Sequence, residues 1–234
     1  NKGDDISKLS GIGRKNLIIN GDFRLNQRGY VSAATLAAGD YGHDRFKAGA
    51  AGGDYSFTQL ASSTQITIAS GKTLIQVVED ANVSGGTYTL SWTGTAQARS
   101  GVDSATPSGA YAASPITISG QTAGTVMSVE FDAGTLSNVQ VELGSVATDF
   151  EHRSIGEELA LCQRYFCKSY NQNSFFGGNS PNGCIAFSNV GGIGARYETR
   201  FPTSMRSAPT VALTRKNGGA VNTAQRQYTD ASYI

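Results

Sequence analysis

The sequence has little charge, and it contains no long basic or acidic block. Asp, Glu, Lys and Arg make up 16% of the 234 residues, against about 25% in ordinary soluble domains, and the net charge is +1. Nucleic-acid-binding domains normally carry a face rich in Lys and Arg, so we expect no nucleic-acid partner. Solubility must come mainly from Ser, Thr, Asn, Gln and Gly, a composition typical of exposed β-architectures.

Long apolar runs are missing as well. No run approaches the roughly 20 residues that a membrane helix needs, so we expect no membrane insertion. The first residues lack the basic, apolar and small-residue order of a secretory signal. Because the chain does not begin with Met, we take it to be a fragment, and the missing signal says little about the parent protein.

Cysteine is scarce, with three residues at positions 162, 167 and 184. A secreted disulfide framework would be denser and even in number. Zinc would need a fourth ligand, and His43 and His152 lie elsewhere in the chain. We therefore expect free, partly buried thiols, no metal and no cofactor.

What the sequence does contain is period-two alternation of apolar and polar residues, the signal of half-buried strands. It is clearest in "TYTLSWT", "TVMSVEF" and "NVQVELG", and shorter strands are predicted around Ile66–Ile68 and Ile116–Ile118. The residues expected to face inward in the three longer strands are Tyr88, Leu90, Trp92, Met127, Val129, Phe131, Val139, Val141 and Leu143. Asn138, Gln140 and Glu142 are expected to face outward. "TLIQVVED" fits either a helical stripe or a strand, and its β-branched content favours the strand.

Strands with one apolar face must bury those faces against each other. The sequence therefore predicts an all-β fold, an antiparallel β-sandwich of jelly-roll type over residues 15–153. In "LIIN", residues 17–20 are expected to pair as a strand, with Asn20-Gly21 turning the chain so that Phe23 closes the end of the core. Residues 1–14 are expected to be a linker or the end of an upstream helix.

The period changes to three and four over residues 154–168, where a helical connector is predicted. Ser154 is the expected N-cap, and Glu157 and Glu158 follow in the first turn. Residues 169–234 are expected to form a smaller C-terminal β-unit, with strands in "CIAFSNV", "ARYETRF" and "PTVALTR". A sheet that small seldom stands alone, so this unit is either truncated or completed by neighbouring chains.

Several stretches resemble the C-terminal receptor-binding region of tailed-bacteriophage tail fibres. They are "NLIINGDFRLNQRGY", "YGHDRFKAG", "TYTLSWTGTAQ", "LSNVQVELGSVATDFEHRSIGEELALCQRYF" and "RFPTSMRSAPTVALT". The resemblance implies a homotrimeric fibre tip of the virion, assembled in the host cytoplasm, that adheres to a bacterial surface polysaccharide or lipopolysaccharide. Relatives often show Asp-Arg-Trp where this chain has Asp44-Arg45-Phe46, and we favour a core position for Phe46.

Candidate ligand-binding residues are aromatics in glycine-rich loops, because recognition usually lies in loops on a rigid scaffold. They are Tyr41, Tyr55, Tyr111, Phe175 and Phe176. For each Tyr, the alternative is a partly exposed side chain without a ligand. Trp92 alternates with Tyr88 and Leu90 and is therefore expected in the core.

Enzymatic activity is not expected. Glu130 and Asp132 have a spacing that would suit a glycosidase, but their face of the strand should be solvated, so that nothing would raise one pKa. Neither His lies near a recognisable nucleophile motif. Asp22 and Asp44 are more simply turn carboxylates than calcium ligands. Two alternatives to a fibre tip remain: a noncatalytic accessory module of a glycan-degrading enzyme, and a structural collar without a ligand.

Overall fold

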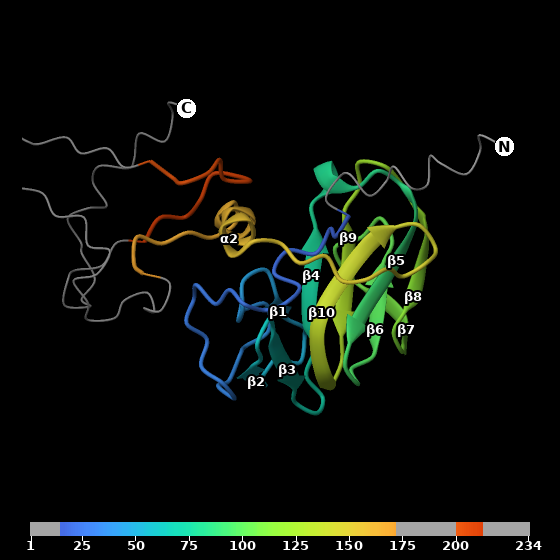
Figure 1. Ribbon diagram of the computed structural model, residues 1–234, viewed down its shortest axis with the longest axis horizontal. Helices are drawn as coiled ribbons and strands as arrows, with labels where there is room; N and C mark the ends of the chain where they lie inside the picture. Colours follow the sequence, from blue (N-terminus) through green and yellow to red (C-terminus); the bar gives the residue numbers. More distant parts are fainter. Residues whose placement is uncertain (1–14, 172–199, 213–234) are drawn as a thin grey trace, which may run out of the picture.

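Ten strands form two antiparallel five-stranded sheets in this computed structural model, which describes residues 15–171 and 200–212 (Figure 1). The first sheet has the order β1-β4-β9-β6-β7, with β1 Lys47–Ala48, β4 Leu74–Val78, β9 Met127–Phe131, β6 Ala98–Gly101 and β7 Ser108–Ala112. The second has the order β2-β3-β10-β5-β8, with β2 Tyr55–Gln59, β3 Thr64–Ile68, β10 Gly134–Leu143, β5 Gly86–Thr93 and β8 Ile116–Gln121. The predicted antiparallel β-sandwich is confirmed, and "TLIQVVED" contributes the strand β4 and not a helix.

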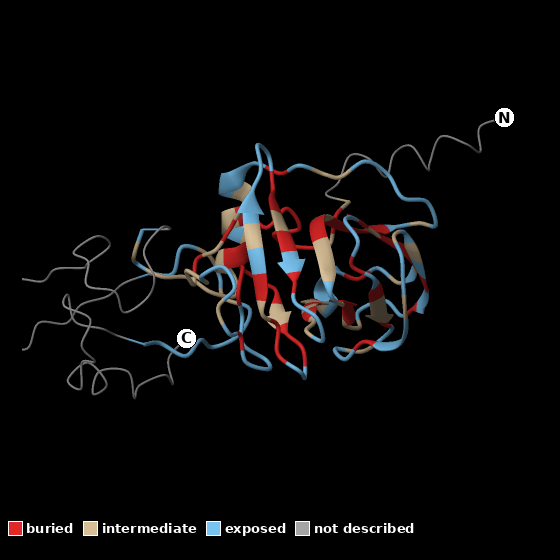
Figure 2. Cartoon of the chain, turned by 90° about the horizontal axis from the view of Figure 1, so that it is seen from below, coloured by how far each residue is buried: buried red, intermediate tan, exposed pale blue. Residues whose placement is uncertain are grey.

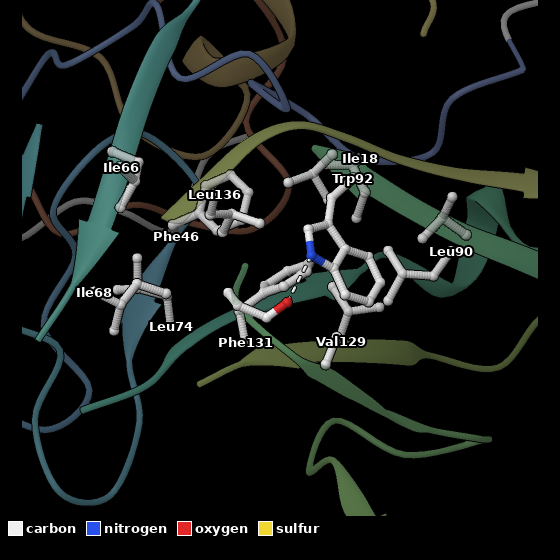
Figure 3. Packing of buried hydrophobic residues seen from close by; sticks show 14 of the residues in the cluster. Ile18, Phe46, Ile66, Ile68, Leu74, Leu90, Trp92, Val129, Phe131 and Leu136 are labelled. Carbon is white, nitrogen blue, oxygen red and sulfur yellow. Dashed lines mark hydrogen bonds between the residues drawn. The ribbon is translucent and has the colours of Figure 1, made fainter. Parts of the chain in front are cut away.

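The core lies between the two sheets, and it is built by the predicted alternation. Buried and exposed residues alternate along several strands (Figure 2), as in β3. Trp92 of β5 is 7% exposed, packs edge-to-face on Phe131 of β9 and donates from Nε1 to the Ala96 carbonyl at 2.9 Å (Figure 3). The core position expected for Trp92 is therefore confirmed, and so is that of Phe46, which is fully buried.

Strand β10 departs from the expected pattern on its outer side. Gln140 and Glu142 are buried although they were expected to face solvent, and Leu143 is exposed although it was expected to face inward. The cause is a covering segment: Thr148 N–H donates to Glu142 Oε1 at 2.8 Å, and Glu151 N–H donates to Gln140 Oε1 at 2.8 Å. These polar side chains are therefore buried with their hydrogen bonds made, as buried polar groups require.

Residues 17–20 are also not the strand that was predicted. The segment runs beside β10, and Leu17 N–H donates to the Val141 carbonyl at 2.8 Å. The return bond is missing because Val141 N–H donates to Asn16 Oδ1, at 3.1 Å, and not to a backbone carbonyl. The predicted turn at Asn20, whose φ is +60°, and the inward position of Phe23, 1% exposed, are both observed.

Helix α2, Ile155–Gln163, lies outside the sandwich beside the N-terminal part of the chain (Figure 1). It buries Cys162 against Ile19 and Leu25, in a small cluster separate from the main core. The helix begins at the predicted N-cap, where the Ser154 hydroxyl accepts from Glu157 N–H at 3.3 Å. A 3₁₀ turn, η1 Asp80–Asn82, follows β4. None of the helices within residues 15–171 and 200–212 has the length and apolar character to cross a membrane.

The cap of α2 gives a first prediction. Replacing Ser154 by Ala should lower the free energy of unfolding by about 1 kcal/mol, because the Glu157 N–H loses its acceptor. Urea unfolding followed by circular dichroism measures this loss. Ser154→Asp is the control, since an Asp side chain also accepts at an N-cap, and equal stability of the Ala and Asp variants would contradict the role of the cap.

Most of the predicted C-terminal β-unit lies outside the described residues, including Cys184 and the strand predicted in "CIAFSNV". Residues 200–212 are described, and they contain neither helix nor strand. Residues 209–212, the beginning of the third predicted strand, are exposed, so they bury no apolar face that would stabilise a strand. The segment is attached to α2 by Arg206 N–H, which donates to the Arg164 carbonyl at 3.0 Å.

Candidate functional site

The five residues predicted to bind a ligand do not come together. Tyr55 is the first residue of β2 and is 1% exposed, so the expectation that it lies in a binding loop is wrong. Its hydroxyl accepts from His43 N–H at 2.7 Å, in space that Gly42 leaves open: a Cβ at Gly42 would lie 2.2 Å from that oxygen. Phe175 and Phe176 lie outside the described residues.

Tyr111 lies on the edge strand β7 and not in a loop. The Arg99 guanidinium carbon lies 4.7 Å from the centre of its ring, and Arg99 Nε donates to Glu130 Oε2 at 2.6 Å. Glu130 is 4% exposed, which corrects the expectation that it is solvated. Burial, and then the neighbouring Glu130 charge, raise the pKa of Tyr111 to about 12. Asp132, the other half of the suggested carboxylate pair, accepts from Gln97 N–H at 2.7 Å.

Tyr41 lines a pocket between the sandwich and the end of α2, which we call the arginine–aromatic pocket. It has a volume of about 140 Å³. Its charged residues are Arg28, Asp44, Arg45 and Arg206. Its aromatic residues are Tyr41, Tyr165 and Phe166, and Cys162 completes the lining.

Four distant segments build this pocket. The loops before β1 provide residues 28–45, α2 provides Cys162, the turn after α2 provides Tyr165 and Phe166, and the segment 200–212 provides Arg206. After Gln163 the helix tightens into a final turn, in which Tyr165 N–H donates to the Cys162 carbonyl three residues earlier at 3.0 Å and Phe166 N–H shares this acceptor at 3.1 Å. The predicted helix to residue 168 is thus too long, and its last aromatics turn toward the sandwich.

Guanidinium groups stack on the aromatic walls of the pocket. The Arg28 guanidinium carbon lies 3.9 Å from the ring centre of Phe166 and 4.8 Å from that of Tyr41. The Arg45 guanidinium carbon lies 3.5 Å from the ring centre of Tyr165. Burial lowers the pKa of both arginines. Because the ordinary pKa of Arg is above about 12, both stay charged at neutral pH.

Arg45 is held in an unusual position. Its φ is +72°, in the left-handed region that a non-glycine residue adopts at a cost of about 1–3 kcal/mol. The residue is 9% exposed, one terminal nitrogen donates to the Val77 carbonyl at 2.5 Å, and Nε is buried without a hydrogen-bond partner in the described structure. The backbone turn thus places a positive group at the wall of the pocket, and one of its donors is buried there without an acceptor in the described structure.

The single carboxylate of the pocket, Asp44, is already occupied. It accepts from Gln27 N–H at 2.6 Å and from Gln27 Nε2 at 2.8 Å, and Arg28 lies 3.7 Å away. This is the hydrogen-bonded turn carboxylate that the sequence favoured over a calcium ligand. No group of three or more His, Cys, Asp or Glu suited to a metal ion occurs among the residues that the structure describes.

Of the five residues predicted to bind a ligand, Tyr41 is the one that lines this pocket in the described structure. Tyr165 fell within the helix predicted over residues 154–168, and the sequence predicted no role for Arg28 or Arg206. The sequence comparison singled out Asp44-Arg45-Phe46 because it departs from a family pattern. It considered only the role of Phe46, which is in the core, and not that of Arg45, which lines the pocket. Positions 28, 45, 165 and 206 meet only after folding, so no spacing in the chain could have signalled the site.

No protein-family model and no curated protein matches the chain. Solved structures with related arrangements include the enzymatically active domain of tailspike protein 4 of bacteriophage CBA120, at 12% identity and a TM-score of 0.32. That match covers 54% of this chain and 21% of the tailspike chain. A second is the carbohydrate-binding module CBM4, at 18% identity and a TM-score of 0.29, covering 53% and 97% of the two chains. A third is a carbohydrate-binding module of Cellvibrio mixtus lichenase 5A in complex with cellotriose, at 12% identity and a TM-score of 0.30, covering 49% and 100%.

Proposed function

We propose that this chain is a noncatalytic adhesion module that binds a bacterial surface glycan at the tip of a tailed-bacteriophage tail fibre. The observation that carries the proposal is the arginine–aromatic pocket, which is open to solvent and holds about 140 Å³. A protein cavity of about 150 Å³ takes up a benzene ring, so this pocket has room for a group of about that size, which is one part of a sugar residue.

The chemistry of the walls suits a sugar. Tyr41 is 38% exposed, so part of its side chain is available to the apolar face of a pyranose. The guanidinium groups of Arg28 and Arg45 offer N–H donors in fixed directions to hydroxyl or ring oxygens. A pocket with aromatic walls and a few convergent polar groups is the usual form of a small-ligand site.

The arrangement of carboxylates supports binding without hydrolysis. A typical glycosidase holds two carboxyl groups across the scissile bond, about 5–10 Å apart. Among the described residues the pocket is lined by one, Asp44, and that group is hydrogen-bonded to Gln27. His43, one of the two histidines of the chain, is buried in the sandwich and does not line the pocket.

The fibre context rests on the sequence resemblance of roughly residues 15–215 to tail-fibre tips. It extends to a homotrimer assembled in the host cytoplasm, where thiols stay reduced. Cys162 and Cys167 are free thiols in the described part of the chain, which is compatible with that compartment. Three pockets in one trimer would let weak sites act together, so that a particle holds to a capsule or lipopolysaccharide through avidity.

The test is adhesion of the full chain to immobilised capsular polysaccharide or lipopolysaccharide, with the supernatant analysed for released oligosaccharide. We expect binding without release, and about tenfold weaker binding by Tyr41→Ala, because the stacking face is lost. The matched control is Tyr111→Ala at the opposite edge of the same sheet, which should bind like the unchanged chain. Binding that survives Tyr41→Ala would remove the pocket from the proposal, and released sugar would favour a glycan-degrading enzyme.

A further inference from the structure

We infer that the sugar bound in the arginine–aromatic pocket is an acidic one, whose carboxylate is held by Arg45 and Arg206. This inference rests on the proposed function and names the chemical class of its ligand. Three guanidinium groups line the pocket, and the described lining contains one carboxylate, Asp44. The lining therefore carries a formal excess of two positive charges.

The excess is not neutralised by the nearest acidic residues. Asp44 accepts two hydrogen bonds from Gln27 and lies 3.7 Å from Arg28. Glu79, just beyond the pocket, is held by Arg164 at 2.6 and 3.1 Å and by the Tyr165 hydroxyl at 2.5 Å. Burial lowers the pKa of Arg45 most, and the positive charge of Arg206 lowers it further. The two arginines therefore repel each other. An anion between them would replace repulsion with attraction.

Arg45 adds a second, independent observation. It is more than nine-tenths buried, and its Nε has no hydrogen-bond partner among the described atoms. A buried N–H without an acceptor costs about 1–3 kcal/mol, more when the group is charged. Nε itself has almost no accessible surface, so a ligand oxygen supplies that acceptor once the Arg45 side chain turns toward the pocket, and a negatively charged oxygen would do so most favourably.

The geometry of stacking favours a planar acid group. Tyr165 covers one face of the Arg45 guanidinium, and Phe166 covers one face of the Arg28 guanidinium. Stacking directs hydrogen bonds to the edges of these planar groups, where the N–H donors lie, and on Arg45 one terminal nitrogen already donates to the Val77 carbonyl. A carboxylate accepts two parallel N–H bonds in that plane.

The inference is tested by two-dimensional NMR titration of the full chain with three probes: methyl β-D-glucuronide, methyl β-D-glucoside and glucose 6-phosphate. The glucuronide should shift the backbone amide signals of Arg45 and Tyr41 at concentrations at least tenfold lower than the glucoside. Arg206→Gln should reduce this preference several-fold. Arg200→Gln is the matched control, because it removes the same charge from an exposed position in the same segment without touching the pocket.

The outcomes separate the inference from the proposed function. Equal binding of glucuronide and glucoside in the pocket would keep the glycan site and overturn the acidic sugar. Stronger binding of glucose 6-phosphate than of the glucuronide would show that the pocket prefers a phosphate to a carboxylate, and it would overturn the inference. If neither sugar shifts pocket signals while Tyr41→Ala still adheres to the bacterial glycan, the pocket itself is not the site and both statements fail.

Discussion

Replacing Arg153 by Met should lower the free energy of unfolding by about 3–5 kcal/mol, which is the usual cost of removing one partner from a buried ion pair. The Arg153 side chain is 4% exposed and lies 3.3 Å from Glu158 Oε1, on α2. It also donates to the backbone carbonyls of Asn16 and Ile18. One side chain thus joins the opening segment, the residues before α2 and the helix itself.

The loss arises mainly from what Arg153 leaves behind. Glu158 is 4% exposed, and burial raises its pKa even though Asn20 N–H and Arg153 both favour the charged form. Without Arg153 the carboxylate would be buried with Asn20 N–H as its remaining donor among those described. The cost should therefore be greatest at neutral pH and should shrink as pH falls, because protonation removes the uncompensated charge.

Urea unfolding at pH 7 and pH 5 measures both effects. Arg153→Met combined with Glu158→Gln should recover part of the loss, since Gln keeps an acceptor for Asn20 N–H without a charge. Lys72→Met is the control, because it removes an ion pair whose side chains are 30% and 26% exposed, and it should cost at most about 1 kcal/mol. A loss below about 1 kcal/mol for Arg153→Met, or no change with pH, would contradict the anchoring role.

The strands were predictable because a single face of each one meets the core. Trp92 and Phe131 belong to different sheets, yet each follows from alternation in its own segment. Ser154 was predictable for a similar reason, since an N-cap depends on its immediate neighbours. Local chemistry determined these features, and tertiary contacts agreed with it.

Predictions failed where a distant segment decides burial. Gln140 and Glu142 look like solvated residues of a half-buried strand, but residues 148–151 cover them and satisfy their hydrogen bonds. Residues 17–20 look like a strand, but the Asn16 side chain takes the donor of Val141 that a ladder would use. The candidate site is the extreme case, because its arginines and aromatics come from four separate segments.

Stability should fall by about 3 kcal/mol between pH 6.5 and pH 4 because of His43 alone. Burial lowers the pKa of His43 from 6.5 to about 4. Its ring packs edge-on against Phe57, with the centres 4.8 Å apart. The Tyr55 hydroxyl lies 2.7 Å from Nδ1 and already accepts from His43 N–H. If Nδ1 gained a proton, it would become a second donor to this oxygen, and the hydroxyl hydrogen would lose its acceptor.

The direction follows from proton binding. Above pH 6.5 the histidine is neutral in both the folded and the unfolded chain, so pH has no effect through it. Between pH 6.5 and about 4 the unfolded chain binds a proton that the folded chain does not, so stability falls as pH falls. Below about pH 4 both states carry the proton and the loss from this group is complete. A shift of about 2.5 pKa units corresponds to about 3 kcal/mol.

Urea unfolding at several pH values between 7 and 4 measures this slope, and His43→Gln should flatten it. Gln does not titrate, and it can still accept from the Tyr55 hydroxyl. The quantity compared is how the difference in free energy of unfolding between His43→Gln and the unchanged chain varies with pH. Taking that difference also cancels the contribution of the carboxylates to the pH dependence. One of them is Glu158, whose raised pKa favours the folded state as pH falls. The control His152→Gln removes the exposed histidine and should keep the slope. Equal slopes for His43→Gln and the unchanged chain would contradict the prediction, because they would show that the pKa of His43 is the same in the folded and the unfolded chain.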